Sequence, residues 1–488
     1  MAQSDLSATA RAFLAAGFKV LTADRVLPTS AFDPHIRVGR DYFGDSIREL
    51  EEYAALEAHL DQAYPARFAN PLKPDSEYAS TYIFSLLEAA VALSWASQDY
   101  STDSEAVTQA VNELVEVLDA ETYEVVCCRA VSHLTTTGDD PVQIGDVSVT
   151  AEPNGSRSLI ELIADEIPGS YSVFNREPPF AYDPPHSLLV VRETTAASDP
   201  FDKAARLSSK LERFLLHLRL LYAGTVQSLY EVQGVGTRVG RMSPLLMTFV
   251  SGPFPTRVRR TVRVSDSDEQ PIGAVAELLA QADVKREGMA WTSFDVALSQ
   301  FIESYGHYRP YDHLVGLATA LEATLASGER DNEGLTLRLR SRAATLLATG
   351  NDPAQTIFSD VTQLYSLRSK LVHGGQIKQK ELCKSIDRIS TVPGDEANRM
   401  FGVALGRAVD RMRDLVRRAI LARLGLAAAP TPLWPLPGAE VSVDAVLCDD
   451  DERAKWRAHW QDKLTELGAG AAVEQAPAAA DYLSQDNR

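Results

Sequence analysis

The sequence predicts a multidomain protein in which an α-rich and α+β N-terminal region is followed by a C-terminal all-α helical bundle. The chain has 488 residues, enough for two or three domains that each bury a core of ordinary size. Hydrophobic residues make up 45% and charged residues 24%, which is the balance of a globular protein. The spacing of apolar residues changes from helical to strand-like near position 141 and is helical again from about 290.

The first residues, MAQSDLSATARAF, lack a basic start followed by an apolar run. No stretch reaches the roughly 18 apolar residues that a membrane span needs, so we expect a cytoplasmic protein with no membrane partner. The cysteines show no C-x-x-C pair and no histidine at zinc-binding spacing. We interpret them as reduced structural thiols and expect no metal and no other cofactor; they are Cys127, Cys128, Cys383 and Cys448.

The net charge of -19 argues against a general nucleic-acid binder, because such proteins need a positive surface for phosphates. The charge is unevenly distributed, however. The segment 290–425 contains 18 lysines and arginines against 15 aspartates and glutamates. We therefore expect any contact with phosphate groups to lie in this segment.

Residues 1–140 are expected to be mostly helical. Apolar residues recur there every three or four positions, most clearly at Val107, Val111, Leu114 and Leu118. The pattern predicts helices over 46–64, 82–96 and 106–131.

Residues 141–270 are expected to form an α+β region with a sensor or regulatory role. Its short β-rich runs lie at 147–151, 188–191, 247–250 and 261–264. A strong helix begins there, with Asp199 as N-cap and Pro200 at the first helical position. Gly234, Gly236 and Gly240 do not match a phosphate-binding loop, because the third glycine is one place too late and no G-K-[ST] follows. The polar run 265–271 is interpreted as a loop or boundary.

Residues 290–425 are expected to form a bundle of five helices. The first has a capping box of Thr292 and Asp295, and the fourth is opened by Asp352 and Pro353. The others are predicted over 308–325, 334–347 and 395–424. In the last one the apolar positions are predicted to face inward and the arginines outward, at Arg407, Arg411 and Arg418.

Residues 426–488 are expected to be a Pro- and Ala-rich linker followed by a largely disordered tail. One amphipathic helix is predicted within it, over 449–467, with Trp456 and Trp460 one turn apart. Such a pair usually docks on the parent domain and less often recruits a partner.

An arginine occupies a helix face that otherwise buries apolar side chains. Ile357, Val361, Leu364, Arg368 and Leu371 recur at 4-3-4-3 spacing. A guanidinium among apolar neighbours is costly unless a carboxylate or a bound phosphate compensates it. His373 follows five positions later, before a glycine pair that favours helix termination, and histidine exchanges protons near neutral pH.

Three segments in this order resemble the HEPN domain, particularly the ApeA-like HEPN group of bacterial anti-phage proteins: ALEATL (320–325), RLRSRAATLL (338–347) and LYSLRSKLVHGG (364–375). The resemblance covers about 290–425. It implies a five-helix domain that dimerises, so that the R-x4-6-H motifs of two protomers line one cleft that cuts RNA without a metal.

By this resemblance Arg368 and His373 are the catalytic residues. Ser369 stands where the family often has Asn, Asp or His, and Glu322 is the candidate acidic group that holds the arginine. Lys370, Lys378 and Lys380 are RNA-binding candidates. Five positions on an ideal helix amount to about 140° of rotation, so either the helix breaks near the glycines or the partner protomer completes the site.

The resemblance implies a toxin-like endoribonuclease of anti-phage defence, acting by abortive infection as a homodimer. Its substrate would be RNA, with tRNA among the candidates, and a phage-derived trigger would act on the N-terminal region. One alternative is a catalytically inactive dimerisation or interaction module attached to a sensing region. Another is a ligand receptor centred on residues 141–265, with the bundle as its dimerisation platform.

Overall fold

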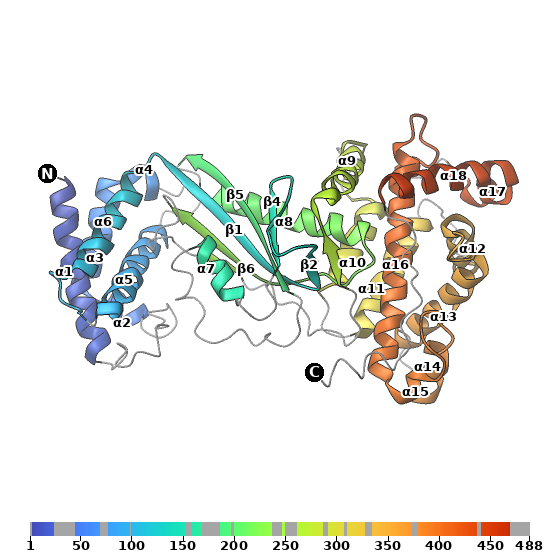
Figure 1. The fold of residues 1–488 in the computed structure, drawn as a ribbon, viewed down its shortest axis with the longest axis horizontal. Helices are drawn as coiled ribbons and strands as arrows, with labels where there is room; N and C mark the ends of the chain where they lie inside the picture. The colour runs from blue at the N-terminus through green and yellow to red at the C-terminus, as the bar shows by residue number, and fades with distance from the viewer. Residues whose placement is uncertain are drawn as a thin grey trace.

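The computed structural model describes residues 2–23, 44–68, 77–97, 99–151, 159–167, 186–196, 200–236, 246–248, 261–285, 291–306, 310–326, 334–372, 378–436 and 441–468. Helices at the N-terminus, an antiparallel sheet and a C-terminal helical bundle follow one another along the long axis of the molecule (Figure 1). This confirms the predicted α-rich, multidomain layout in outline. Among the described helices, none combines the length and the apolar character that a membrane span requires.

The N-terminal region is built from α1 (Ala2–Ala23), α2 (Gly44–Arg48), α3 (Glu51–Ala63), α4 (Pro65–Phe68), α5 (Glu77–Ser97) and α6 (Glu105–Asp119). The stripe predicted on α6 is buried over its whole length. Ser104 caps this helix, since its side chain accepts a hydrogen bond from the Val107 amide at 3.2 Å.

The helix predicted over 106–131 is wrong beyond Asp119, because Thr122–Ser132 forms strand β1. Side chains of this strand enter two different cores, Val125 and Cys127 on one face and Val126 and Cys128 on the other. A strand buried on both faces has no polar alternation, so its apolar run can be mistaken for a buried helix. The sheet therefore begins before the predicted boundary at 140.

The main sheet is antiparallel, in the order β3-β4-β5-β1-β6-β7. Its other strands are β3 (Val142–Ile144), β4 (Val147–Ala151), β5 (His186–Ala196), β6 (Gln227–Gly236) and β7 (Leu246–Thr248). A separate parallel pair joins β2 (Leu134–Thr136) to β8 (Val262–Val264). Each predicted β-rich run overlaps one of these strands, although positions 249 and 250 lie outside the described residues.

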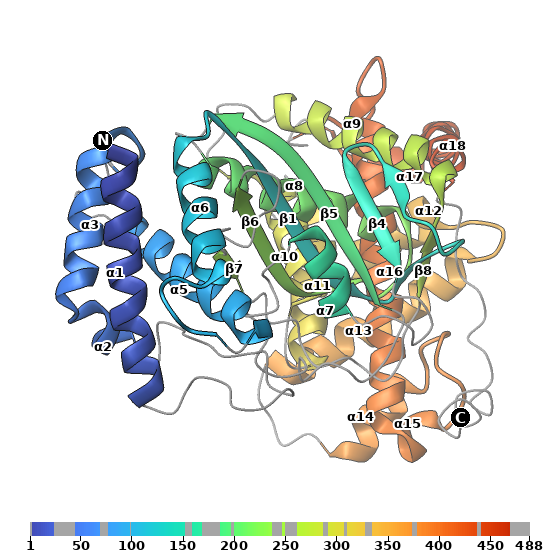
Figure 2. The same cartoon turned by 60° about the vertical axis from the view of Figure 1, so that its left-hand side comes forward.

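Helices cover the two faces of the sheet (Figure 2). The longer one, α8 (Pro200–Leu221), begins at the predicted proline and packs on β1 and β5. Asp199, the residue predicted to cap this helix, lies outside the described part of the chain. The shorter one, α7 (Leu159–Glu166), packs on the other face. Gly234 on β6 allows the chain after α7 to approach, since a Cβ there would lie 2.9 Å from Cγ2 of Ile167.

The C-terminal bundle contains α9 (Glu269–Lys285), α10 (Ser293–Glu303), α11 (Pro310–Leu325), α12 (Leu335–Leu347), α13 (Ala354–Val372), α14 (Gln379–Ile386), α15 (Glu396–Arg399) and α16 (Phe401–Ala428). The capping box of Thr292 and Asp295 is present. Two features were not predicted: α14, and α9, which starts inside the run interpreted as a loop. Helix α16 lies at the centre and contacts α8, α9, α11, α12 and α18 (Figure 1).

The segment after α16 is ordered as far as 468, apart from 437–440, which is not described. It forms α17 (Val443–Cys448), which was not predicted, and α18 (Asp450–Glu466), which confirms the helix predicted over 449–467. Residues 469–488, where disorder was expected, lie outside the described residues. Trp456 and Trp460 dock on the bundle as expected. Trp456 stacks on Trp434 with ring centroids 5.4 Å apart, and the Trp460 indole donates to the Leu346 carbonyl at 2.7 Å.

The sheet is joined to the bundle where α8 ends against α16. The Arg417 guanidinium donates to the carbonyls of Leu220 and Leu221, each at 3.0 Å. These are carbonyls of the last turn of α8, which have no partner within their own helix. Arg219 of α8 and Arg413 of α16 both lie over the Tyr305 ring, 4.3 and 4.7 Å from its centroid. The C-terminal end of α8 is therefore held by charged side chains of the bundle.

Docking of α18 is expected to contribute strongly to stability. Replacing Trp460 by alanine should lower the free energy of unfolding by about 3–5 kcal/mol, because it opens a cavity and removes the bond to Leu346. Trp291 is 67% exposed, so Trp291→Ala should change it by less than about 0.5 kcal/mol. Urea denaturation followed by circular dichroism measures both, and equal effects would contradict the docking of α18.

Candidate functional site

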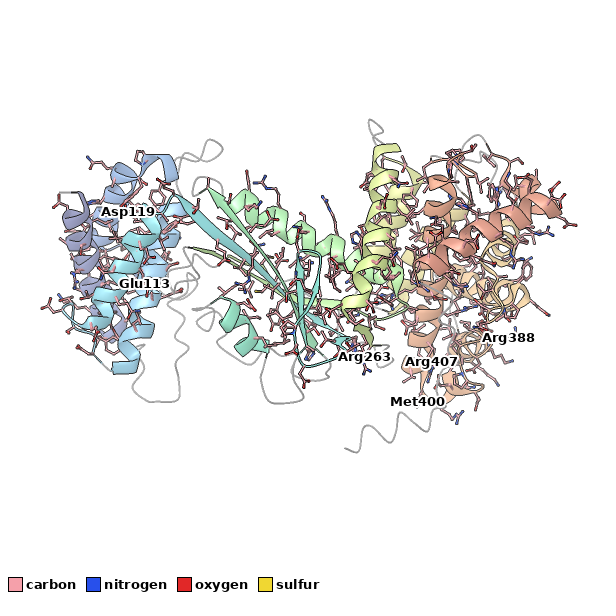
Figure 3. All side chains as sticks on the ribbon, turned by 45° about the horizontal axis from the view of Figure 1, so that its top comes forward. Glu113, Asp119, Arg263, Arg388, Met400 and Arg407 are labelled. Atoms are coloured by element: carbon pink, nitrogen blue, oxygen red, sulfur yellow. The ribbon has the colours of Figure 1, made fainter. Side chains whose placement is uncertain are left out.

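Helix α16 carries six arginines whose side chains are buried: Arg407, Arg411, Arg413, Arg417, Arg418 and Arg423. The prediction that Arg407, Arg411 and Arg418 face outward is therefore wrong. Every residue from 403 to 427 except Asp410 is buried, because neighbouring helices surround α16 and leave it no outward face. Figure 3 shows Arg407 on this helix.

Carboxylates from other segments compensate these charges. Asp352 accepts two hydrogen bonds from Arg411, both at 2.9 Å, and pairs with Arg418 as well. Asp360 accepts from Nε of Arg411 at 2.7 Å. Both aspartates are 1% exposed, so this is a buried ion cluster whose charges neutralise one another.

Asp414 completes the cluster from α16 itself, with contacts to Arg417 at 2.7 Å and Arg418 at 3.1 Å. Burial alone would raise the pKa of Asp414, but the nearby Arg418 and Arg417 outweigh it and lower that pKa far below its ordinary value. The carboxyl group is therefore charged in the folded protein throughout the physiological range.

The other buried arginines of α16 also have partners. Arg407 pairs with Glu396 at 2.9 Å and Arg413 with Asp410 at 2.7 Å. Arg423 donates to the carbonyl of Trp434 at 2.8 Å and lies 3.8 Å from the centroid of that ring. These six cations make up a third of the 18 basic residues counted between 290 and 425. They are not available to phosphate, so the positive balance of this segment overstates its positive surface.

Arg368 differs from this group. On the predicted apolar face of α13, Ile357, Val361 and Leu364 are fully buried, as expected. Arg368 and Leu371, on the same face, are half-buried. Nε of Arg368 is buried and has no hydrogen-bond partner. The arginine makes no hydrogen bond or ion pair with the residues that the structure describes. Its donors are therefore available to an anion.

Tyr365 lies one helical turn before this arginine on α13. The Tyr365 hydroxyl donates to the Ala318 carbonyl at 2.9 Å and so links α13 to α11. Burial first, and then the charge of the Glu322 carboxylate, raise the pKa of Tyr365 well above its ordinary value, whereas Arg368 lowers it. Glu322 and Arg368 thus act on one phenol, but no ion pair joins them to each other.

The remaining candidates are distributed around the end of α13 and the start of α14. Helix α13 extends to Val372; His373 and the glycines after it lie outside the described residues. Ser369, Lys378 and Lys380 are exposed, whereas Lys370 donates to the Ser385 hydroxyl at 3.0 Å and ties α13 to α14. The sequence analysis assigned no role to Tyr365. Its position three residues before Arg368, one helical turn away, was the available signal.

The two thiols of β1 offer little nucleophilic chemistry. Burial raises the pKa of Cys127 and of Cys128 well above the ordinary thiol value, so both stay protonated and unreactive. Cys383 is also buried, and Cys448 is exposed. Within the described ranges, no three His, Cys, Asp or Glu side chains are placed to hold a metal ion together.

The buried cluster should make stability depend on pH in acid. Because the folded state lowers the pKa of Asp414, its stabilisation is present above the ordinary value of 3.8 and is lost as the pH falls below it. Asp414→Asn should lower the free energy of unfolding at pH 7 by about 3–5 kcal/mol, since it leaves buried arginines uncompensated. The loss of stability between pH 5 and 3, measured by urea denaturation, should be smaller in the variant.

Asp139, an exposed carboxylate, provides the control for this experiment. Asp139→Asn should leave the free energy of unfolding at pH 7 within about 0.5 kcal/mol of the unaltered protein. An Asp414→Asn protein as stable as the control at pH 7 would contradict the assigned ion pairs.

Comparison with known proteins identifies no relative. No protein-family model matches the chain, and neither a curated protein nor a solved structure shows significant similarity to it. The case for a function therefore depends on the side chains around Arg368 and on the sequence resemblance described above.

Proposed function

We propose that the chain is a metal-independent endoribonuclease of the HEPN type. The observation that supports this most directly is the contrast between Arg368 and the arginines of α16. Each of those has a carboxylate or carbonyl partner, whereas the guanidinium of Arg368 makes no hydrogen bond or ion pair with the described residues, and its Nε is buried. A buried hydrogen-bond donor without an acceptor costs free energy. A bound phosphate group would supply the acceptor and offset that cost.

The chemistry requires only groups that this region of the sequence supplies. RNA carries its own nucleophile in the 2'-hydroxyl. Cleavage needs a base that removes its proton, an acid that protonates the leaving 5'-oxygen, and positive charge on the phosphate as it becomes more negative. Arg368 would hold two phosphate oxygens through parallel hydrogen bonds, and His373 would transfer the protons.

The surroundings of Arg368 are suited to a nucleic-acid backbone. Lys378 and Lys380 are exposed on the first turn of α14, and Lys370 lies on α13 two residues after Arg368. Lysines placed in this way strengthen binding of a phosphate chain without reading its sequence. Ser369, exposed beside Arg368, is polar but carries no charge, so its contribution would be a hydrogen bond.

The biological role follows from the resemblance to the ApeA-like HEPN group. The protein would act as a homodimer formed through the bundle, with the motifs of both protomers in one cleft. It would be a cytoplasmic effector of anti-phage defence that stops growth by cutting RNA, with tRNA as a candidate substrate. A phage-derived trigger would act on the N-terminal region.

Incubation of the purified protein with total RNA in excess EDTA tests the activity. We expect fragments that end in a 2',3'-cyclic phosphate, and a loss of cleavage by about 100-fold or more in Arg368→Ala and in His373→Ala. The matched control is Arg388→Ala, an exposed arginine of the same bundle (Figure 3), which should cleave normally. Equal cleavage by all three variants, or a strict need for a metal ion, would contradict the proposal.

Growth of cells that overproduce the protein separates the enzyme from a non-catalytic interaction module. The unaltered protein and Arg388→Ala should slow growth, whereas Arg368→Ala and His373→Ala should not. Equal toxicity of all four proteins would favour the module, because an assembly role does not depend on these two side chains.

A further inference from the structure

Helix α12 carries arginines at every second position from 338 to 342, and they do not share one face. Arg338 and Arg342 are four positions apart and therefore lie on the same side of the helix. Arg342 pairs there with Asp444 at 2.6 Å and donates to the Leu325 carbonyl at 2.7 Å. Arg340 is turned about 200° away from them, and its contacts are made with α13 instead.

The guanidinium of Arg340 is held in place but has few hydrogen-bond partners. It lies over the Phe358 ring, 4.7 Å from the centroid, and a ring beneath the plane leaves the N–H donors at its edges unoccupied. Its hydrogen bond to the Thr362 hydroxyl is long, at 3.5 Å. Nε is buried without a partner, and no carboxylate among the described residues pairs with this arginine.

The point where Arg340 meets α13 belongs to a line of hydroxyl side chains that leads to the proposed catalytic site. Thr362, Ser366 and Ser369 follow one another at 4-3 spacing, so they lie on one face of the helix. All three are exposed or half-buried. In the sequence His373 continues the series four positions later, although it lies outside the described residues. Seven residues of helix separate Thr362 from Ser369, roughly 10 Å along the axis.

A phosphate group is the anion that suits this position. Part of the Arg340 side chain meets solvent, because the residue is half-buried, and its planar fork of donors matches the oxygens of a phosphate. An RNA strand carries a phosphate at every nucleotide. If one phosphate is bound at Arg368, the same strand therefore presents others at a distance that Arg340 can meet. The hydroxyls between them can bond to the sugar-phosphate backbone without reading its sequence.

We propose that Arg340 is a second phosphate-binding residue, which holds the RNA backbone a few nucleotides away from the bond that is cut. This inference rests on the proposed function and extends it to the course of the substrate. The strand lies along the face of α13 that carries Thr362, Ser366 and Ser369.

Binding of a single-stranded 2'-O-methyl RNA oligonucleotide tests this without catalysis, because such a probe has no free 2'-hydroxyl to attack the phosphate. Fluorescence anisotropy gives the Kd over a series of salt concentrations. Arg340→Gln should weaken the Kd by about tenfold, the effect of losing a hydrogen bond from a charged group. It should also reduce the slope of log Kd against log salt concentration by about 0.7, the value for one phosphate contact on a single strand.

Two further variants serve as controls in the same titration. Arg340→Lys keeps the positive charge and should restore the slope, since a lysine contacts phosphate as a point charge. Arg388→Gln removes an exposed arginine of the same bundle and should change neither the Kd nor the slope. A folding defect lowers the fraction of protein that binds and leaves the slope as it was, so the slope separates a lost contact from a damaged core.

An Arg340→Gln protein with the slope of the unaltered protein would overturn the inference, whether or not its Kd is weaker. Arg368→Ala distinguishes the two levels of the proposal. If Arg368→Ala cleaves RNA normally, the proposed function is wrong. If it fails to cleave while Arg340→Gln keeps the normal Kd and slope, only the role of Arg340 is wrong.

Discussion

The pairing of Asp352 with Arg411 and Arg418 is the constraint on which the bundle depends. Moving a guanidinium out of water costs several kcal/mol unless a carboxylate meets it in good geometry. Helix α16 can therefore be buried on all sides only if the chain around Asp352 and Asp360 supplies those carboxylates. This requirement sets the position of α13 against α16, and it determines where Arg368 lies.

The bundle consequently contains arginines in two different situations. Those of α16 are neutralised, and they act as cross-links between helices and with the chain that leads to α18. Arg368 lies on a neighbouring helix, half-buried, and no carboxylate among the described residues pairs with it. Residue type alone does not separate a structural cation from one that binds a ligand; the separation comes from whether the donors of the side chain are already satisfied.

The same use of charge joins the sheet to the bundle. Arg417 donates hydrogen bonds to the last carbonyls of α8, and both Arg219 and Arg413 lie over the Tyr305 ring. Since α8 also covers one face of the sheet, a displacement of α8 would strain contacts made by α16. Among the described residues, the proposed sensing region and the proposed catalytic bundle are thus linked through packed helices, hydrogen bonds and cation–π contacts.

The sequence by itself determined the elements with one polar face or a local cap: the stripe on α6, the capping box before α10, the docking of Trp456 and Trp460, and the seam that contains Arg368. Periodicity records which side of an element meets water, so it failed where no side does. Burial on both faces disguised β1 as a helix, and a buried α16 was given an outward face for Arg407, Arg411 and Arg418. Only the tertiary structure decided these cases and brought the Tyr365 hydroxyl to the Ala318 carbonyl, because the partners that make a buried charge or hydroxyl tolerable come from segments some 40 to 60 residues away.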